Sequence, residues 1–222
     1  MTSDVLPIYQ ELRQEIESLQ IVPGTRLGEI ELTTRFGVSR TPIRDVLKKL
    51  EEDGLVRIVP KSGTYVTPLD MEGFEDEMFL RFSIETAVMK TLFGRLSEND
   101  IDVLRQILNE QKQTLTESEN FRAPERFYGL DEAFHKAIYS FANKEGIYHR
   151  MQTKSPTFSR YRHVTFFRDI RYLSSLFSIH ERLLEALVAQ DGDALEAASR
   201  EHNYSGLEGL AEVRKTHPTW FA

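Results

Sequence analysis

Apolar residues recur every three or four positions in three successive segments near the start of the chain, which is the spacing of one face of an α-helix. The first two predicted helices cover residues 6–19 and 29–36. The third begins near Ser39 or Thr41, either of which can cap it, and stops near Gly54. The residues expected to face the core are Ile8, Leu12, Ile16, Leu19, Ile30, Leu32, Phe36, Ile43, Val46, Leu47 and Leu50.

Gly37 should end the second helix in a tight turn, because glycine readily adopts a left-handed backbone conformation. A hairpin should follow the third helix, since residues 55–59 and 64–67 are short β-type runs on either side of a Lys-Ser-Gly turn. Three helices and a hairpin in fewer than 70 residues predict an N-terminal winged helix-turn-helix domain over residues 1–69.

The pattern changes after residues 68–70, which form a candidate linker. Strand signals vanish from about residue 71, and stripes of apolar residues at helical spacing predict an all-α domain over residues 70–222. Six or seven antiparallel helices would form this bundle, so the predicted fold class is mainly α. The clearest stripes are Leu80, Ile84, Val88 and Leu92; Ile101, Leu104, Ile107, Leu108 and Leu115; and Phe127, Leu130, Phe134, Ile138 and Phe141.

Capping residues mark several helix ends in this second domain. Ser97 should cap the helix that carries the second stripe. Gly192 should end a helix over residues 174–190, and Asp193 should cap the next one, over residues 193–213.

Composition narrows the class of protein. The chain has 222 residues, of which 40% are hydrophobic and 28% charged, and its mean hydropathy is -0.40. It is therefore long enough to bury a sizeable core. No apolar run approaches the roughly 18 to 20 residues that span a bilayer, and the N-terminus lacks the pattern of an export signal. Cysteine is absent, which excludes disulfides and thiolate metal sites. We expect a cytoplasmic protein with no membrane partner.

One helix is basic although the whole chain carries a net charge of -7. Residues 39–49 hold four basic side chains against one acidic side chain, a local charge of 4 - 1 = +3. Short charged runs often do no more than solvate an exposed face. Binding to nucleic acid, however, requires a basic face at the contact and not a basic protein.

In a helix-turn-helix the third helix enters the major groove with its first residues against the base edges. Arg40 and Arg44 are four positions apart and therefore lie on one helix face. Either can pair with O6 and N7 of guanine, and Thr41 can reach a thymine methyl or a phosphate. These residues predict sequence-specific contacts to DNA, although a winged helix can also serve in protein contacts.

Further candidate contacts to DNA surround this pair. Lys48 and Lys49 suit phosphates, and Ser39 can donate a hydrogen bond to one. Lys61 lies in the hairpin turn, and Gly63 at its tip would let the backbone approach DNA closely.

A second group of candidate residues lies in the helical domain. Asp131 and His135 are four apart on one helix, and His180 is on the inward side of its own helix. His180 lies 12 positions before Gly192, and His202 lies 10 positions after it. In an antiparallel hairpin the two histidines are thus at similar heights on neighbouring helices. Each histidine alone could be a buried residue bonded to a carboxylate, but together the four residues predict a metal site within a bundle.

The first domain closely resembles that of the GntR superfamily of bacterial transcription regulators. The resemblance rests on residues 23–66, PGTRLGEIELTTRFGVSRTPIRDVLKKLEEDGLVRIVPKSGTYV. It implies that Arg40, Thr41, Arg44 and Gly63 contact the operator. One position differs, because Ile30 stands where the namesake of the FadR subfamily has a further DNA-contacting arginine.

The second domain resembles the metal-binding FCD effector domain of the FadR subfamily. The resemblance rests on DEAFH with Asp131 and His135, on IHERLLEAL with His180, and on REHNY with His202. It implies that these four residues bind a divalent metal, which the ligand types leave open as Zn, Ni, Mn or Fe. The LRFSIE stretch implies that Arg81 faces a ligand cavity and binds the carboxylate of a small organic acid.

Together these features predict a ligand-responsive transcription regulator, most simply a repressor, that binds a palindromic operator as a homodimer. Two alternatives remain open at this point. One is a metal-dependent enzyme acting on small organic acids, for which no activated nucleophile or general base is evident near the four ligands. The other is a helical module that a metal stabilises without any effector.

Overall fold

The computed structural model describes residues 5–116, 123–152, 156–166 and 170–222, which divide into two compact units. Unit 1 contains the chain up to residue 75 together with residues 155–165 and 209–222, and unit 2 contains residues 76–154 and 166–208. Two later segments thus pack with the N-terminal one. The expected division into domains after residue 69 stays a prediction.

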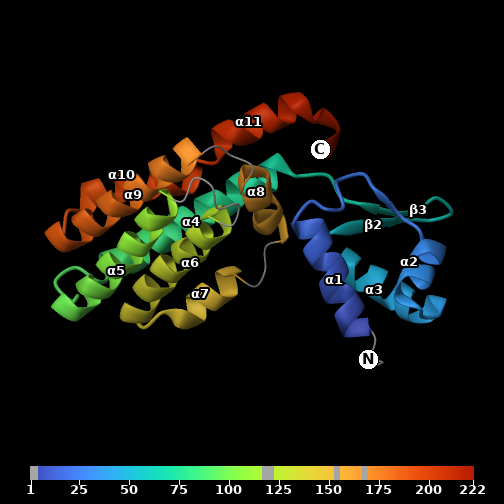
Figure 1. The fold of residues 1–222 in the computed structure, drawn as a ribbon, viewed down its shortest axis with the longest axis horizontal. Coiled ribbons are helices and arrows are strands. Elements are labelled where there is room, and N and C mark those ends of the chain that lie inside the picture. The colour runs from blue at the N-terminus through green and yellow to red at the C-terminus, as the bar shows by residue number, and fades with distance from the viewer. Residues whose placement is uncertain (1–4, 117–122, 153–155, 167–169) are drawn as a thin grey trace. The chain divides into compact units, whose positions relative to one another are not determined.

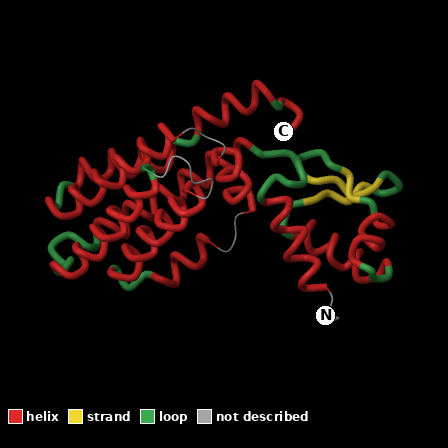
Figure 2. Tube along the Cα trace, in the orientation of Figure 1, coloured by secondary structure: helices red, strands yellow, loops and turns green. Residues whose placement is uncertain are grey.

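Unit 1 has the predicted winged helix-turn-helix (Figure 1, Figure 2). Its three strands pair antiparallel in the order β1-β3-β2. β1 was not predicted, because a strand of two residues has no recognisable pattern and exists only through its pairing with β3. The elements are α1 (Val5–Glu17), β1 (Arg26–Leu27), α2 (Glu29–Phe36), α3 (Arg40–Glu52), β2 (Val56–Val59) and β3 (Gly63–Val66).

The core of this winged helix is formed by the predicted apolar faces of α1 and α3, with one exception in α2. Leu12, Ile16, Ile43 and Leu50 are all fully buried. Ile30 was expected to be an apolar anchor, but its side chain is 65% exposed. The helix α2 has only about two turns and buries Leu32, and a residue two positions earlier lies on the other side of the helix.

The turn between α2 and α3 places the start of α3. Gly37 has a φ of 65° and ends α2 in the left-handed conformation, as predicted. Ser39 occupies the N-cap position of α3, but its side chain makes no capping hydrogen bond. The hydroxyl of this exposed residue is therefore not engaged with the first turn of the helix.

The candidate linker is packed within unit 1. Leu69 is 1% exposed; its N–H donates to the carbonyl of Trp220 (2.6 Å), and its own carbonyl accepts from Ala222 N (3.0 Å). The buried guanidinium of Arg160 donates to Thr67 Oγ1 (3.0 Å) and to the Thr67 carbonyl (2.5 Å). Arg160 belongs to α8 (Pro156–Phe166), and Trp220 to a short 3₁₀ helix (Pro218–Trp220) that follows α11 (Leu207–Thr216).

The described part of unit 2 is all-helical, as expected, and contains six α-helices (Figure 1). They pack around a core that includes the fully buried Phe127, Phe134, Leu183 and Leu195. The helices are α4 (Met71–Lys90), which enters the unit at residue 76, α5 (Glu98–Thr114), α6 (Ala123–Phe141), α7 (Glu145–Gln152), α9 (Ile170–Ala189) and α10 (Gly192–Tyr204). Within the described residues, no helix is both long and apolar enough to cross a membrane.

Details of this unit differ from the predicted pattern. Leu80 is 50% exposed, although it was expected to begin a buried stripe on α4. The last predicted helix is interrupted, since α10 ends at Tyr204 and α11 begins at Leu207. Asp191, and not Asp193, caps α10, because its side chain accepts from the N–H groups of residues 193 and 194 (3.1 and 3.0 Å). Ser97 forms the predicted cap of α5 as part of a capping box.

Candidate metal centre and nucleic-acid interface

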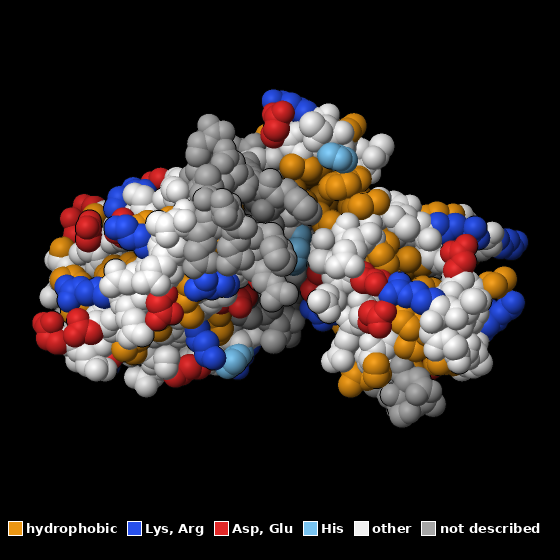
Figure 3. Space-filling view, in the orientation of Figure 1, with side chains coloured by type: hydrophobic (Ala, Val, Ile, Leu, Met, Phe, Trp, Pro, Cys, Tyr) orange, Lys and Arg blue, Asp and Glu red, His pale blue; other side chains and the backbone are white. Residues whose placement is uncertain are grey.

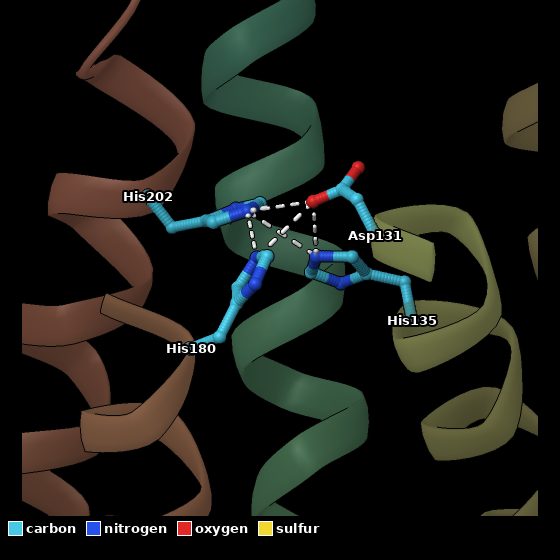
Figure 4. Close-up of side chains that lie close together, drawn as sticks. All are labelled: Asp131, His135, His180 and His202. Atoms are coloured by element: carbon cyan, nitrogen blue, oxygen red, sulfur yellow. Dashed lines mark hydrogen bonds and ion pairs between the residues drawn. The ribbon is translucent and has the colours of Figure 1, made fainter. Parts of the chain in front are cut away.

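Three helices of unit 2 bring together the four residues predicted to bind a metal (Figure 4). Asp131 and His135 project from one side of α6, one turn apart, whereas His180 comes from α9 and His202 from α10. Their candidate ligand atoms all lie within 4.8 Å of one another. The hairpin of α9 and α10 sets His180 opposite His202, as the matched spacing about Gly192 predicts.

The ligand atoms converge at separations that suit a single ion. His202 Nε2 lies 2.9 Å from His180 Nε2 and 3.3 Å from His135 Nε2. Asp131 Oδ1 lies 3.1 Å from His180 Nε2, 3.5 Å from His202 Nε2 and 3.8 Å from His135 Nε2. Two atoms that each bind a common ion at about 2.0 to 2.2 Å are roughly 3 to 3.5 Å apart in octahedral or tetrahedral geometry.

Asp131 Oδ1 is buried and has no hydrogen-bond partner in the described part of the chain, although three imidazole nitrogens surround it. A buried carboxylate oxygen without a donor is costly unless it binds a cation. This orphaned oxygen fits a metal ligand. An Asp carboxylate with three imidazoles is also a donor set that divalent transition metals accept.

The protonation states agree with such a donor set. Burial would raise the pKa of Asp131, but the contacts with His180 and His202 outweigh it and hold that pKa well below its ordinary value. Burial lowers the pKa of His180 to about 4, against the opposing effect of Asp131. Burial also lowers the pKa of His135. The aspartate is thus ionised and these two imidazoles are neutral at pH 7, which are the forms that bind metals.

Arg81, the predicted effector contact, is buried beside this cluster. Its Nε donates to Glu77 Oε1 (3.2 Å), and one of its η nitrogens lies 3.8 Å from Glu85 Oε1. The other oxygen of Glu85 lies 4.0 Å from His135 Nδ1 and accepts from the side chain of Asn203 (3.1 Å). Arg81 is therefore linked to a candidate metal ligand through Glu85, the last residue of the LRFSIE stretch, for which the sequence predicted no role.

The predicted DNA-reading residues lie on the exposed face of α3. Arg40, Thr41, Arg44 and Lys48 are all exposed. Arg44 Nε lies 3.0 Å from both carboxylate oxygens of Glu29, at the start of α2. This pair leaves the two terminal nitrogens of Arg44 for other acceptors.

Lys49 differs from its neighbour Lys48. Its ammonium group lies 4.2 Å from the centre of the Tyr9 ring, within unit 1. This cation–π contact joins the partly buried Lys49 of α3 to α1. The expected contact of Lys49 with a phosphate stays a prediction.

The wing adds basic side chains that were not predicted. Arg26 in β1 and Arg57 in β2 both lie opposite Tyr65 in β3, so the three side chains share one face of the sheet. Lys61, in the turn, is exposed with a φ of 63°. Figure 3 shows Lys and Arg side chains gathered at the end of unit 1 that carries the hairpin. Arg26 was missed because β1 itself was not predicted, and Arg57 lies in a predicted strand but was not recognised as its neighbour on one face.

Gly63 at the base of β3 has a structural reason to be glycine. Its φ is 141°, and a Cβ added there would lie 2.8 Å from Nε of Arg26. A side chain at this position would be strained by the backbone conformation and would push aside the end of the Arg26 side chain. The predicted close approach of this glycine to DNA stays a prediction.

Comparison with known proteins identifies both units. A family model for bacterial regulatory proteins of the gntR family matches residues 5–66, and a model for the FCD domain matches residues 77–204. The HTH-type transcriptional repressor RspR of Escherichia coli K12 is 31% identical over 97% of this chain and 92% of its own length. A Streptomyces ambofaciens protein described as an uncharacterised HTH-type transcriptional regulator is 28% identical over 97% of this chain and 88% of its own.

Solved structures share the fold. A putative GntR transcriptional regulator from Rhodococcus sp. RHA1 has a TM-score of 0.68 at 20% identity, covering 95% of this chain and 99% of that one. McbR/YncC of E. coli has a TM-score of 0.67 at 19% identity, covering 96% and 99%. The family and its named relatives are transcriptional regulators and not enzymes, which removes the enzymatic alternative. The chain belongs to the GntR family of bacterial HTH-type transcriptional regulators, with an FCD domain following the DNA-binding domain.

Proposed function

We propose that this regulator is a metal-dependent repressor of the FadR subfamily, which binds a palindromic operator as a homodimer and responds to a small carboxylate effector. The observation that carries the proposal is the convergence of Asp131, His135, His180 and His202 around one buried, otherwise unpartnered carboxylate oxygen. These four residues would hold a divalent ion, which supplies Lewis-acidic positions for the oxygens of an organic acid.

The DNA-binding half of the proposal rests on α3. The exposed side chains of Arg40 and Arg44 project from one face of a helix whose opposite face forms the core. Lys48, Lys61 and Ser39 would contact phosphates around that helix. The repressor role is supported by the name of RspR, a relative that is 31% identical.

Arg81 is the proposed partner of the effector carboxylate. Arg81 pairs with Glu77 through Nε, and an incoming carboxylate would compete with Glu77 for the guanidinium while the link to Glu85 remains. The effector would then bind one arrangement of α4 more tightly than the other. A ligand can shift the equilibrium between two arrangements of a protein only through such a difference in affinity.

The test is a fluorescence anisotropy titration of the full chain on duplex DNA from the region upstream of its own gene. We expect Arg44→Ala to weaken binding and the exposed Arg105→Ala on α5 to leave it unchanged. The same titration, with metal-loaded and chelated protein and a panel of small organic acids, tests the effector. If the affinity for the operator stayed the same with and without metal and with every acid, the ion would stabilise the helical unit without regulating DNA binding.

A further inference from the structure

Gln111 on α5 is completely buried beside the proposed metal centre, although α5 supplies none of the four candidate ligands. Its Oε1 lies 2.9 Å from Nδ1 of His180, which is also completely buried. Its Nε2 donates to the backbone carbonyl of Phe127 on α6, at 3.4 Å. Burying a primary amide is unfavourable unless its oxygen and nitrogen both find partners, and this amide has one at each end.

The two partners determine which way the amide points. A backbone carbonyl only accepts hydrogen bonds, so the NH₂ group of Gln111 must face Phe127 and the oxygen must face the imidazole. That oxygen also only accepts, so His180 Nδ1 must carry the proton and donate it. A neutral imidazole has one N–H, and the lone pair of His180 is therefore on Nε2.

Nε2 of His180 is the atom that lies 3.1 Å from Asp131 Oδ1 and 2.9 Å from His202 Nε2. Without Gln111, the proton of His180 could reside on Nε2 and bond to Asp131, which would block the position that a metal needs. The ring of Phe134 stacks on the imidazole (centroids 5.1 Å apart, planes at 30°) and restricts its rotation.

We infer that Gln111 is a positioning residue of the metal centre, which fixes the tautomer and orientation of His180 so that its Nε2 lone pair faces the ion. This inference rests on the proposed metal binding. The other two histidines lack an equivalent partner in the described residues: Glu85 is 4.0 Å from His135 Nδ1, beyond hydrogen-bond length, and His202 Nδ1 is buried without a hydrogen bond. His180 is thus the most firmly oriented of the three imidazoles.

The same amide also joins two helices that carry ligands. Phe127 precedes Asp131 by one turn of α6, and His180 belongs to α9. Gln111 therefore sets the distance between a carboxylate ligand and an imidazole ligand through a single side chain. Partners of this kind, outside the ligand set, typically change metal affinity about 10- to 100-fold when they are removed.

The experiment compares three variants of the full chain with the unaltered protein. Gln111→Met removes both hydrogen bonds at similar side-chain length, Gln111→Glu keeps an acceptor for His180 but loses the donor to Phe127, and Gln113→Met is a control at an exposed position of the same helix. Affinity for Zn²⁺ is measured by competition with a chelating dye. Long-range ¹H–¹⁵N NMR of the metal-free protein at pH 7 reports which nitrogen of His180 carries the proton.

We expect Gln111→Met to bind Zn²⁺ about 10- to 100-fold more weakly and to show His180 protonated at Nε2. We expect Gln111→Glu to keep Nδ1 protonated and to retain most of the affinity, and Gln113→Met to behave like the unaltered protein. The inference is overturned if the unaltered protein carries the proton on Nε2, or if Gln111→Met binds Zn²⁺ as tightly as the unaltered protein does.

The two readouts also separate this inference from the proposed function. If the unaltered protein failed to bind Zn²⁺, the proposed metal binding would be in doubt, while the NMR spectrum of the metal-free protein would still decide the tautomer. If Gln111→Met failed to fold, Gln111→Glu and the unaltered protein would still show whether His180 carries its proton on Nδ1, as inferred, or on Nε2.

Discussion

Metal addition should stabilise unit 2, and replacing a single ligand should remove the effect. The change is Asp131→Asn, which keeps the size of the side chain and removes the charge of the orphaned carboxylate. The matched control is Glu132→Gln, which removes the same charge from an adjacent, exposed position. Each protein is studied after chelation and after addition of Zn²⁺.

The expected magnitude follows from linkage. A ligand that binds only the folded state at 100 times its dissociation constant stabilises that state by about 2.7 kcal/mol. For a protein of this size, each kcal/mol corresponds to roughly 2 to 4 °C in Tm. We therefore expect the melting transition of unit 2, followed by circular dichroism, to rise by about 5 to 10 °C with Zn²⁺ in the unaltered protein and in Glu132→Gln. In Asp131→Asn the rise should be lost.

The quantity to compare between variants is the rise in Tm on adding Zn²⁺, and not the Tm itself. Asp131→Asn could change the stability of the metal-free protein in either direction, because the new amide can donate to the imidazoles. Only the rise on adding Zn²⁺ reports the ion. An equal rise in Asp131→Asn and in the unaltered protein would refute the assignment of this carboxylate as a ligand.

The metal-free protein should also lose stability in acid through the same residues. The pKa of His180 is about 4 when folded, against about 6.5 in an unfolded chain. Between these values the unfolded chain binds a proton that the folded chain does not, so stability falls as the pH falls. The full shift corresponds to roughly 3 kcal/mol. The lowered pKa of Asp131 acts with the same sign at still lower pH. A urea unfolding series with no change from pH 6.5 to 4.5 would contradict this reasoning.

Three further predictions concern DNA binding, a helix cap and the core. Arg40→Ala and Arg44→Ala should each weaken operator binding roughly 5- to 150-fold and relax the base preference, whereas Lys48→Ala should weaken all sequences alike; a binding-site selection experiment distinguishes the two outcomes. Ser97→Ala removes the acceptor of the capping box at α5 and should cost about 0.5 to 2 kcal/mol in urea unfolding. Leu50→Ala leaves a cavity at a fully buried position and should cost about 2 to 5 kcal/mol, also measured by urea unfolding.

Elements were predicted correctly where the residues of the segment itself carry the signal, and were missed where the structure depends on pairing with a distant segment. The helices α1 to α3 each pack on one side, so their apolar spacing alone predicted all three elements and the buried faces of α1 and α3, whereas Ile30 of α2 was wrongly expected to be buried. The strand β1 has two residues and forms only because Arg26 and Leu27 pair with β3. No local pattern marks such a strand, and the basic face that it forms with β2 was missed with it.

The error at α4 has a different physical cause. The side of α4 that faces the core carries Arg81 and Glu85, which are buried because they pair with each other and with neighbours. Apolar Leu80 lies on the exposed side. Where a helix lines a polar site, hydrophobic periodicity no longer indicates the buried face. The rest of the predicted stripe is correct, since Val88 and Leu92 are buried, and the pattern fails only at Leu80, beside the polar pair.

The four candidate ligands were predictable because their chemistry and spacing are both distinctive. A carboxylate and a histidine four positions apart share one helix face, and the hairpin sets the other two histidines at matching heights. Gln111 has neither property, because it is a neutral residue on a helix that supplies no ligand. Its role follows only from the three-dimensional contacts with His180 and Phe127.

The charges around the site explain why a divalent ion would fit there. Asp131, Glu77 and Glu85 carry three formal negative charges and Arg81 carries one positive charge, which gives 1 - 3 = -2 for these mostly buried groups. The neutral imidazoles add nothing to this sum. Unpaired charge is costly away from water, and a divalent cation would bring the total to zero. An anionic effector would then make the total negative again unless Glu77 left Arg81 for solvent. For the proposed effector, release of Glu77 from Arg81 would thus keep the total at zero when the acid carries a single negative charge.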